Sequence, residues 1–293
     1  MRNKEDKWPH LSCLMFNEHI GIMAVGETHL TEAQIEEIED AAVGRKRLRI
    51  FNSIDPDHPN KGGVAVVLNR DITNTENIKV RRLIPGRAIL VTIPWHDKLT
   101  LTVLAVYAPA GSAAENRAFW EELHRLWMTE NLPVPDVMLG DMNIVEDAVD
   151  RLPHRTDDAD ATHALADLKR ILELKDGWRM TYPDTKEYIF SRGTGSHSRI
   201  DRIYVSPTSG NTVLSYPPIL WPFPPCIANI GPGPPFVLER PSIQAWPSWH
   251  CIPHSHSPHP TPPLPLPRTE FPLAASTWLV SVTGRRRSGN TSR

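Results

Sequence analysis

The sequence predicts an α/β protein of layered architecture over residues 1–206, followed by a proline-rich tail over residues 207–293. Short runs rich in Val, Ile and Leu alternate with helix-like segments as far as Ser206, and this rhythm is typical of sheets covered by helices. Ten prolines lie in residues 1–201 and nineteen in residues 202–293. Because each proline removes a backbone donor and disfavours helices and interior strands, we expect the tail to be disordered.

The elements of the body follow from hydrophobic periodicity and from the residues that interrupt it. The apolar run 21–27 predicts a strand, and Thr31 can cap a following helix in which Ile35 and Ile38 share a face. Strands are then expected at residues 49–52, 63–69, 88–93 and 99–107, followed by a helix at 113–129 and a strand at 136–140. The body should close with a helix near 161–174 and strands at 187–190 and 199–205.

The charge of the chain is divided unevenly between body and tail. Residues 1–201 hold 25 basic and 32 acidic residues, a net charge of −7, whereas residues 202–293 hold 7 basic and 2 acidic residues, a net charge of +5. An acidic body excludes a general polyanion-wrapping role, so any nucleic-acid contact must come from a local patch. The candidates for phosphate contacts are the basic residues Arg45, Lys46, Arg47, Arg49, Arg81, Arg82 and Arg87, with simple solvation as the alternative.

Composition also bears on the compartment. No apolar run approaches the roughly 18 residues of a membrane helix, which excludes a membrane span, and the charged N-terminus lacks the apolar core of a secretory signal. Three cysteines cannot pair completely, so we expect a reduced intracellular protein, nuclear or cytoplasmic and not secreted.

Two tail features invite functional readings. A zinc site is one reading of the cluster His250, Cys251, His254, His256 and His259, and compositional bias is the favoured alternative because no folded frame holds these residues. The run 285–287, three arginines, could be a nuclear or nucleic-acid patch, but a solvated basic end is the favoured reading.

Polar residues at strand ends carry the chemistry of the body. Glu27 follows an apolar strand, where a carboxylate can face a cleft, although many such residues are only solvated. Tyr107 ends a long strand and could instead be a half-buried packing residue. Asp141 and Asn143, in GDMN, can face one crevice or form an Asx turn. Asp201 lies amid strand residues and needs a partner, because a buried unpaired carboxylate is costly.

The ordered set of motifs is more specific than any one of them. KW at residues 7–8, GETHL, KGGVAVVLN, VYAP, GDMN, DGWR and SRIDRIYVS follow one another at plausible separations. Over roughly residues 7–206 this set resembles the endonuclease/exonuclease/phosphatase superfamily, also called DNase I-like. Within it the set looks most like the endonuclease domains of non-LTR retrotransposons and their apurinic/apyrimidinic relatives.

The resemblance implies a four-layer α/β sandwich of two mainly antiparallel sheets flanked by helices, and metal-assisted hydrolysis of a phosphodiester in nucleic acid. By matching motif, Glu27 would hold Mg²⁺ or Mn²⁺, and Tyr107 and Asn143 would bind or polarise the phosphate. Asp141 would position or activate the attacking water, and Asp201 would orient a catalytic histidine.

The sequence departs from that family pattern at both ends. The family's first strand, which carries an Asn of the site, is not found before the KW motif, and the Ser-Asp-His that follows the SRID strand is not found after Asp201. We therefore expect impaired catalysis. A phosphomonoesterase of the same superfamily, or a non-catalytic relic or binding module, remains the alternative.

Overall fold

The structure is a computed structural model that describes residues 7–41, 46–59, 61–95, 99–192, 195–206, 212–215, 226–232 and 277–282. Its helices and strands run in the following order along the chain: α1 (Lys7–Asn17), β1 (Ile22–Gly26), α2 (Glu32–Ala41), β2 (Leu48–Ser53), β3 (Val64–Asn69), β4 (Lys79–Ile84), β5 (Ala88–Pro94), β6 (Thr100–Tyr107), α3 (Ala113–Thr129), β7 (Val137–Asp141), η3 (Ala148–Asp150), β8 (Arg151–Leu152), α4 (Ala159–Ile171), β9 (Lys175–Asp176), α5 (Gly177–Thr181), β10 (Phe190–Arg192), β11 (Ser196–Ser198), β12 (Asp201–Val205), β13 (Thr212–Ser215), β14 (Cys226–Pro232) and β15 (Thr277–Val282).

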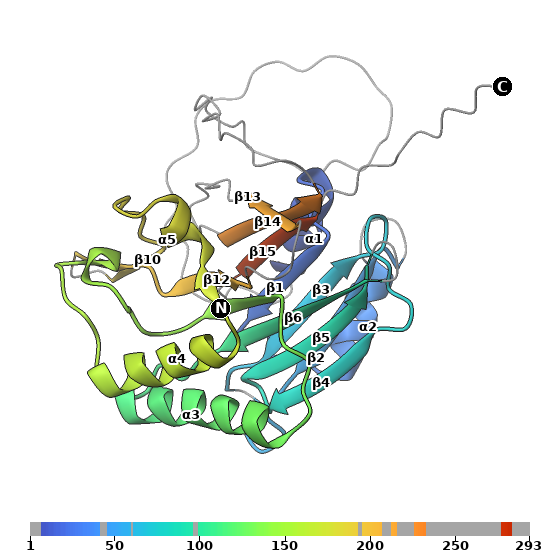
Figure 1. Cartoon of the computed structure of the whole chain (residues 1–293). Coiled ribbons are helices and arrows are strands. Elements are labelled where there is room, and N and C mark those ends of the chain that lie inside the picture. The colour runs from blue at the N-terminus through green and yellow to red at the C-terminus, as the bar shows by residue number, and fades with distance from the viewer. Residues whose placement is uncertain are drawn as a thin grey trace, which may run out of the picture.

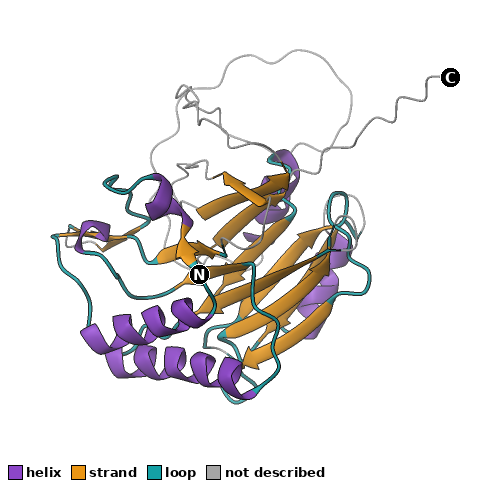
Figure 2. Cartoon of the chain, in the orientation of Figure 1, coloured by secondary structure: helices purple, strands orange, loops and turns teal. Residues whose placement is uncertain are grey.

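Two six-stranded sheets form the centre of the molecule. The first sheet has the strand order β13-β14-β15-β1-β3-β2, and the second has the order β4-β5-β6-β7-β12-β9. Neighbouring strands are antiparallel except for the β14–β15 and β6–β7 pairs. Helices α3 and α4 lie side by side along one side of the molecule, and the strands occupy its middle (Figures 1 and 2). The expected four-layer sandwich of mainly antiparallel sheets is confirmed.

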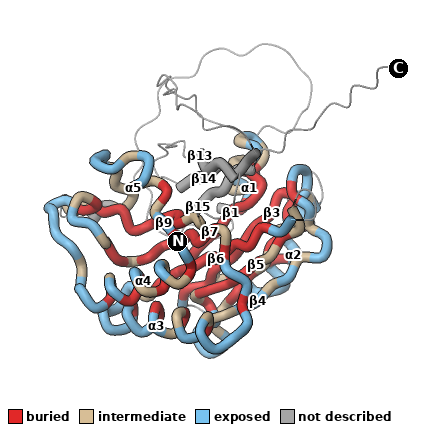
Figure 3. Tube along the Cα trace, in the orientation of Figure 1, coloured by how far each residue is buried: buried red, intermediate tan, exposed pale blue. Residues whose placement is uncertain are grey.

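Three hydrophobic clusters join the layers. Alternate residues of each central strand face the other sheet, and this inner cluster includes Ala24, Val66, Val103 and Leu139. The opposite residues of the second sheet pack against α3 and α4, and those of the first sheet pack against α1 and α2. Figure 3 shows the result as continuous buried stretches along the central strands.

Local sequence explains where the helices begin. The Ser112 hydroxyl accepts a hydrogen bond from the Glu115 backbone N–H at 3.2 Å and so caps α3, whose bounds agree with the prediction. Thr31 likewise accepts from the Gln34 N–H at 3.3 Å at the start of α2. Such caps satisfy backbone donors that the first turn leaves unpaired.

Three differences from the sequence prediction stand out. Helix α1 was not predicted, nor was β4, an edge strand whose side chains are largely exposed and therefore lack an apolar signature. The prediction that prolines exclude interior strands after Ser206 is wrong for β14 and β15, whereas β13 lies at the edge of its sheet. The reason is that prolines flank these short segments rather than interrupt them, apart from Pro232 at the end of β14. The other residues of 207–293 lie outside the described part of the chain.

Two further observations concern expectations about the compartment. Cys13, on α1, is disulfide-bonded, which differs from the reduced cysteines that we expected. In the described part of the chain, no helix is both long and apolar enough to cross a membrane.

Candidate functional site

The register of the second sheet brings three of the predicted site residues into one row. Tyr107 at the end of β6 lies opposite Asp141 at the end of β7, and Asp141 lies opposite Asp201 at the start of β12. Residues directly opposite one another share a face of the sheet. Tyr107 belongs to the cluster between the sheets, so the row lies at the edge of that inner face.

Glu27 reaches this row from the first sheet. It follows β1 directly, and its positive φ of 49° turns the chain out of the strand. The Tyr107 hydroxyl donates a hydrogen bond to Glu27 Oε1 at 2.5 Å. The Glu27 carboxylate, which follows a strand of the first sheet, therefore contacts the Tyr107 phenol of the second sheet at the edge of the core.

The GDMN loop fixes Asp141 and Asn143 relative to each other. Asp141 Oδ1 accepts a hydrogen bond from the Asn143 backbone N–H at 2.8 Å, and the Asn143 side-chain amide donates to the Ala108 carbonyl at 2.8 Å. The Asx turn considered from sequence is therefore present. Gly140 is required here, because it has φ of 147° and an added Cβ would lie 1.8 Å from the Val106 carbonyl oxygen.

Burial and charge perturb two of these groups. Burial, together with the negative charge of Glu27, raises the pKa of Asp141 to about 7, although hydrogen bonds from Asn143 act in the opposite direction. Burial and the hydrogen bond to Glu27 also raise the pKa of the Tyr107 phenol. Asp141 is only 5% exposed, so its ionised form lacks the solvation that water would give it.

A divalent cation fits these features. Two carboxylates that repel one another in a poorly solvated place favour a positive charge between them, and Mg²⁺ is commonly held by one or two carboxylates with water and substrate oxygens. Within the described residues no group of three or more His, Cys, Asp and Glu side chains is arranged to hold a metal ion. Few described residues could therefore serve as Mg²⁺ ligands here, and Glu27 is the first candidate.

Residues that the sequence did not single out hold the loops of the site. Asn116 on α3 donates to the carbonyls of Pro109 and Met142 at 3.0 and 2.9 Å, which ties the VYAP and GDMN loops together. The Thr28 hydroxyl donates to the Asn52 side chain at 2.8 Å beside Glu27. The only signal for Asn116 in the sequence is a polar residue on an otherwise apolar helix face.

The arginines that flank Asp201 in the chain belong to a buried network of charges. Arg199 donates to both oxygens of Asp150 at 2.8 and 2.9 Å and to Asp176 at 2.7 Å. Arg202 is paired with Asp176 and Asp150, each at 3.0 Å. Burial by itself would raise the pKa of Asp176, but Arg199 and Arg202 hold it down at about 2. The arginines of the SRIDR motif thus anchor the strand that carries Asp201 to the DGWR segment.

The family model described as Endonuclease/Exonuclease/phosphatase family matches residues 14–248. The chain belongs to this family.

Solved structures agree with the family's fold. The AP endonuclease LMAP from Leishmania major is similar with a TM-score of 0.57 at 17% identity, over 76% of this chain and 81% of that chain. TDP2 of D. rerio, complexed with a single-stranded DNA product, has a TM-score of 0.50 at 13% identity, over 72% of this chain and 81% of that chain. At these identities the likeness establishes a shared fold. No curated protein matches the sequence.

Most of the basic residues proposed from sequence are neutralised in this family member. Three of them pair with carboxylates of the body: Arg47 with Asp71, Arg49 with Glu39 at 3.3 Å, and Arg81 with Glu130 at 2.8 Å. Lys46 lies 3.6 Å from Asp40. Arg45 lies outside the described residues, as do the histidine cluster at 250–259 and the arginine run at 285–287.

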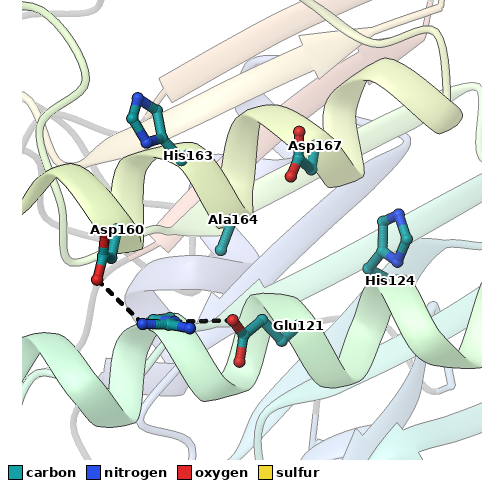
Figure 4. A pocket seen from close by; sticks show the side chains of 7 residues that line it. Glu121, His124, Asp160, His163, Ala164 and Asp167 are labelled. Atoms are coloured by element: carbon teal, nitrogen blue, oxygen red, sulfur yellow. Dashed lines mark hydrogen bonds and ion pairs between the residues drawn. The ribbon is translucent and has the colours of Figure 1, made fainter.

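A separate hollow of about 260 Å³ lies between α3 and α4 (Figure 4). Its lining includes His124, His163 and Asp167, and Arg117 bridges Glu121 and Asp160 across it. This hollow is on the outer helix layer, away from the row at the strand ends. It brings together none of the residues that the family motifs single out.

Proposed function

We propose that this chain is an endonuclease-type hydrolase that acts on phosphodiester bonds of nucleic acid with Mg²⁺ or Mn²⁺, and that its turnover is slow. One observation carries the proposal: the Tyr107 hydroxyl donates to Glu27 at 2.5 Å while Tyr107 lies opposite Asp141 in the sheet register, so that both carboxylates gather around one residue at the strand ends. Paired carboxylates with a perturbed pKa are typical of functional sites. Nucleic acid is the favoured substrate because the two most informative structural neighbours are an AP endonuclease and a protein solved with a DNA product.

Each residue of the row receives a role that its contacts support. Glu27, oriented by the Tyr107 hydroxyl, would hold Mg²⁺, which supplies charge neutralisation at the phosphate. Asp141 has a pKa near neutrality and would accept the proton of an attacking water. Asn143 is held by its N–H bond to the Ala108 carbonyl and by its side-chain hydrogen bond to Asp141, and its amide would donate to the phosphate when the substrate enters beside Asp141.

Slow turnover is proposed because, in the family pattern, the acid at the position of Asp201 acts by orienting a catalytic histidine. The printed chain has no aspartate after Asp201, and the histidines that follow lie in a proline-rich stretch outside the described residues. A positioned acid or base contributes about 10²–10⁴-fold to such a reaction. We therefore expect the site to bind metal and phosphate even though the hydrolysis step is slow.

The test is nicking of supercoiled plasmid by the full chain in Mg²⁺ and in EDTA, beside the Asp141→Asn variant. We expect nicking in Mg²⁺ that barely exceeds the EDTA background and that the substitution removes. Rapid nicking that depends on Asp141 would show that turnover is not impaired. Absence of both nicking and plasmid binding would refute the proposed activity.

A further inference from the structure

The chain between β2 and β3 lies at the end of the molecule that holds the row. Its two ends both rest on the turn before β5. The Gly86 N–H donates to the Ser53 hydroxyl at 3.1 Å, and the Gly86 carbonyl accepts the Gly63 N–H at 3.0 Å. A Cβ built on Gly86 would lie only 3.2 Å from Asp55 Cβ. The β2–β3 loop is therefore closed over Gly86.

This closure brings the β2–β3 loop against Tyr107. A Cβ built on Gly62 would lie 3.5 Å from Tyr107 Cδ1. The Thr28 N–H donates to the Gly63 carbonyl at 3.4 Å. Thr28 directly follows Glu27, whose carboxylate accepts a hydrogen bond from the Tyr107 hydroxyl. The loop thus packs beside the two residues at which we propose metal and phosphate binding.

An aspartate–histidine pair lies on this loop. Asp55 Oδ2 lies 3.4 Å from His58 Nδ1, and Asp55 Oδ1 accepts the His58 backbone N–H at 3.3 Å. The Lys61 N–H donates to the His58 carbonyl at 2.8 Å, which closes a turn just before Gly62. A carboxylate at Nδ1 fixes the ring and stabilises the imidazolium, which leaves Nε2 as the proton donor. The His58 side chain is 59% exposed, so a substrate can reach it.

The geometry of phosphoryl transfer decides what an acid on this side can do. The attacking and leaving oxygens stand roughly in line across the phosphorus. In the proposed reaction Asp141 activates the water, so the leaving oxygen lies on the other side of the phosphate. Along the sheet, Tyr107 and then the Gly86 turn lie on one side of Asp141, and Asp201 lies on the other. An acid on the β2–β3 loop is therefore on the side of Asp141 that suits the leaving group.

We propose that His58, oriented by Asp55, is the general acid that protonates the leaving oxygen of the phosphodiester. The inference rests on the proposed function and adds the group that completes its proton transfers. The water oxygen bonds to phosphorus while its proton passes to Asp141. The bond from phosphorus to the leaving oxygen breaks, its electron pair stays on that oxygen, and the oxygen takes the proton of His58 Nε2. The products are a phosphate monoester and an alcohol, and exchange with solvent restores both side chains.

His58 does not replace the histidine of the family pattern. That histidine is oriented by the acid at the position of Asp201, at the opposite end of the row from the β2–β3 loop. Slow turnover is therefore compatible with an acid on the leaving side. The remaining rate should depend on His58.

The test compares leaving groups that do and do not need a proton. Labelled DNA duplexes carry at one position an ordinary linkage, or sulfur in place of either bridging oxygen. A thiolate leaves without a proton, because a thiol is far more acidic than an alcohol. Cleavage at that position is measured with excess full chain in Mn²⁺ over long incubations. The variants are His58→Gln, Asp55→Asn, Asp141→Asn and, as a matched control, His163→Gln, an exposed histidine of α4.

We expect His58→Gln to cleave the ordinary linkage about 100-fold more slowly than the wild type, since a positioned acid contributes at least that much. Cleavage at the sulfur linkage that the wild type prefers should stay within about twofold of the wild-type rate. Asp55→Asn should lose part of the rate on oxygen and none on sulfur. His163→Gln should match the wild type on every duplex, and circular dichroism checks that each variant is folded.

Equal losses on oxygen and sulfur in His58→Gln, or no loss on either, would overturn the role of His58 and leave the proposed function standing. A wild type that cleaves only the sulfur linkage would also overturn it, because no group then delivers the proton. A loss in His163→Gln as large as in His58→Gln would do the same. Absence of Asp141-dependent cleavage of any duplex by the wild type would overturn the proposed function, and the role of His58 with it.

Discussion

Replacing Asp141 by Asn should stabilise the protein, although it removes a residue of the proposed site. The substitution keeps the shape of the side chain and an oxygen that can accept the Asn143 N–H, which lies 2.8 Å from Oδ1. What changes is the charge of a group that is 5% exposed. A neutral amide stands in for the protonated acid, which is the form that the folded state prefers.

The sign and size follow from the pKa. In the folded chain the pKa of Asp141 is about 7, above the ordinary value of 3.8 that applies to the unfolded chain. Between these two values the unfolded chain has lost the proton and the folded chain keeps it, so wild-type stability falls as pH rises. A difference of about 3 pKa units corresponds to about 4 kcal/mol by pH 8, of which about 3 kcal/mol develops between pH 5 and pH 8.

The assay is urea unfolding in EDTA at pH 5, 6, 7 and 8, followed by tryptophan fluorescence. The wild type and Asp141→Asn share every other titrating group, so the difference between their unfolding free energies isolates Asp141. We expect the variant's advantage to grow steadily across this range and to shrink when Mg²⁺ is added to the wild type. A difference that is independent of pH, or a less stable variant at pH 8, would refute the assignment of a buried, charge-repelled carboxylate.

Two further predictions concern the scaffold. Arg199→Met should lower the unfolding free energy by about 3 kcal/mol in urea, because it removes a guanidinium that hydrogen-bonds both buried carboxylates, Asp150 and Asp176, and leaves Arg202 as the partner that they share, whereas Arg125→Met on the surface should change the unfolding free energy far less; equal costs would show that the network is not stabilising. A chain that ends at Ser206 should unfold at a lower urea concentration than the full chain, since it loses β15, which pairs with β1 in the first sheet, and an unchanged unfolding midpoint would show that the strands after Ser206 do not stabilise the domain.

The sequence predicted the central strands because their signal is local. Segments such as Val64–Asn69 and Thr100–Tyr107 are almost wholly buried, so their continuous apolar runs are typical of interior strands. Edge strand β4 escaped prediction because its exposed Lys and Arg side chains carry no such pattern. The strands after Ser206 escaped prediction because the pairing of β15 with β1, which joins them to the sheet, is a long-range property that proline counting does not detect.

The site shows the same division between local and long-range information. Glu27, Tyr107, Asp141 and Asp201 could be proposed from strand-end positions and from the order of the family motifs. Their adjacency depends on the register between β6, β7 and β12, which no single segment encodes. Of the seven basic candidates in the sequence, Lys46, Arg47, Arg49 and Arg81 are paired with carboxylates, and only the structure shows these pairs.

The most direct test of the central claim is whether metal and nucleic acid bind to one site at Glu27. Duplex affinity is measured by fluorescence anisotropy in EDTA and in a Mg²⁺ series for the wild type, for Glu27→Gln, and for Glu121→Gln, an exposed residue of α3 that pairs with Arg117. Because coupling between two ligands is reciprocal, we expect Mg²⁺ to tighten duplex binding in the wild type and in Glu121→Gln but not in Glu27→Gln. The same Mg²⁺ dependence in Glu27→Gln and the wild type would contradict a metal-assisted phosphodiester site at this residue.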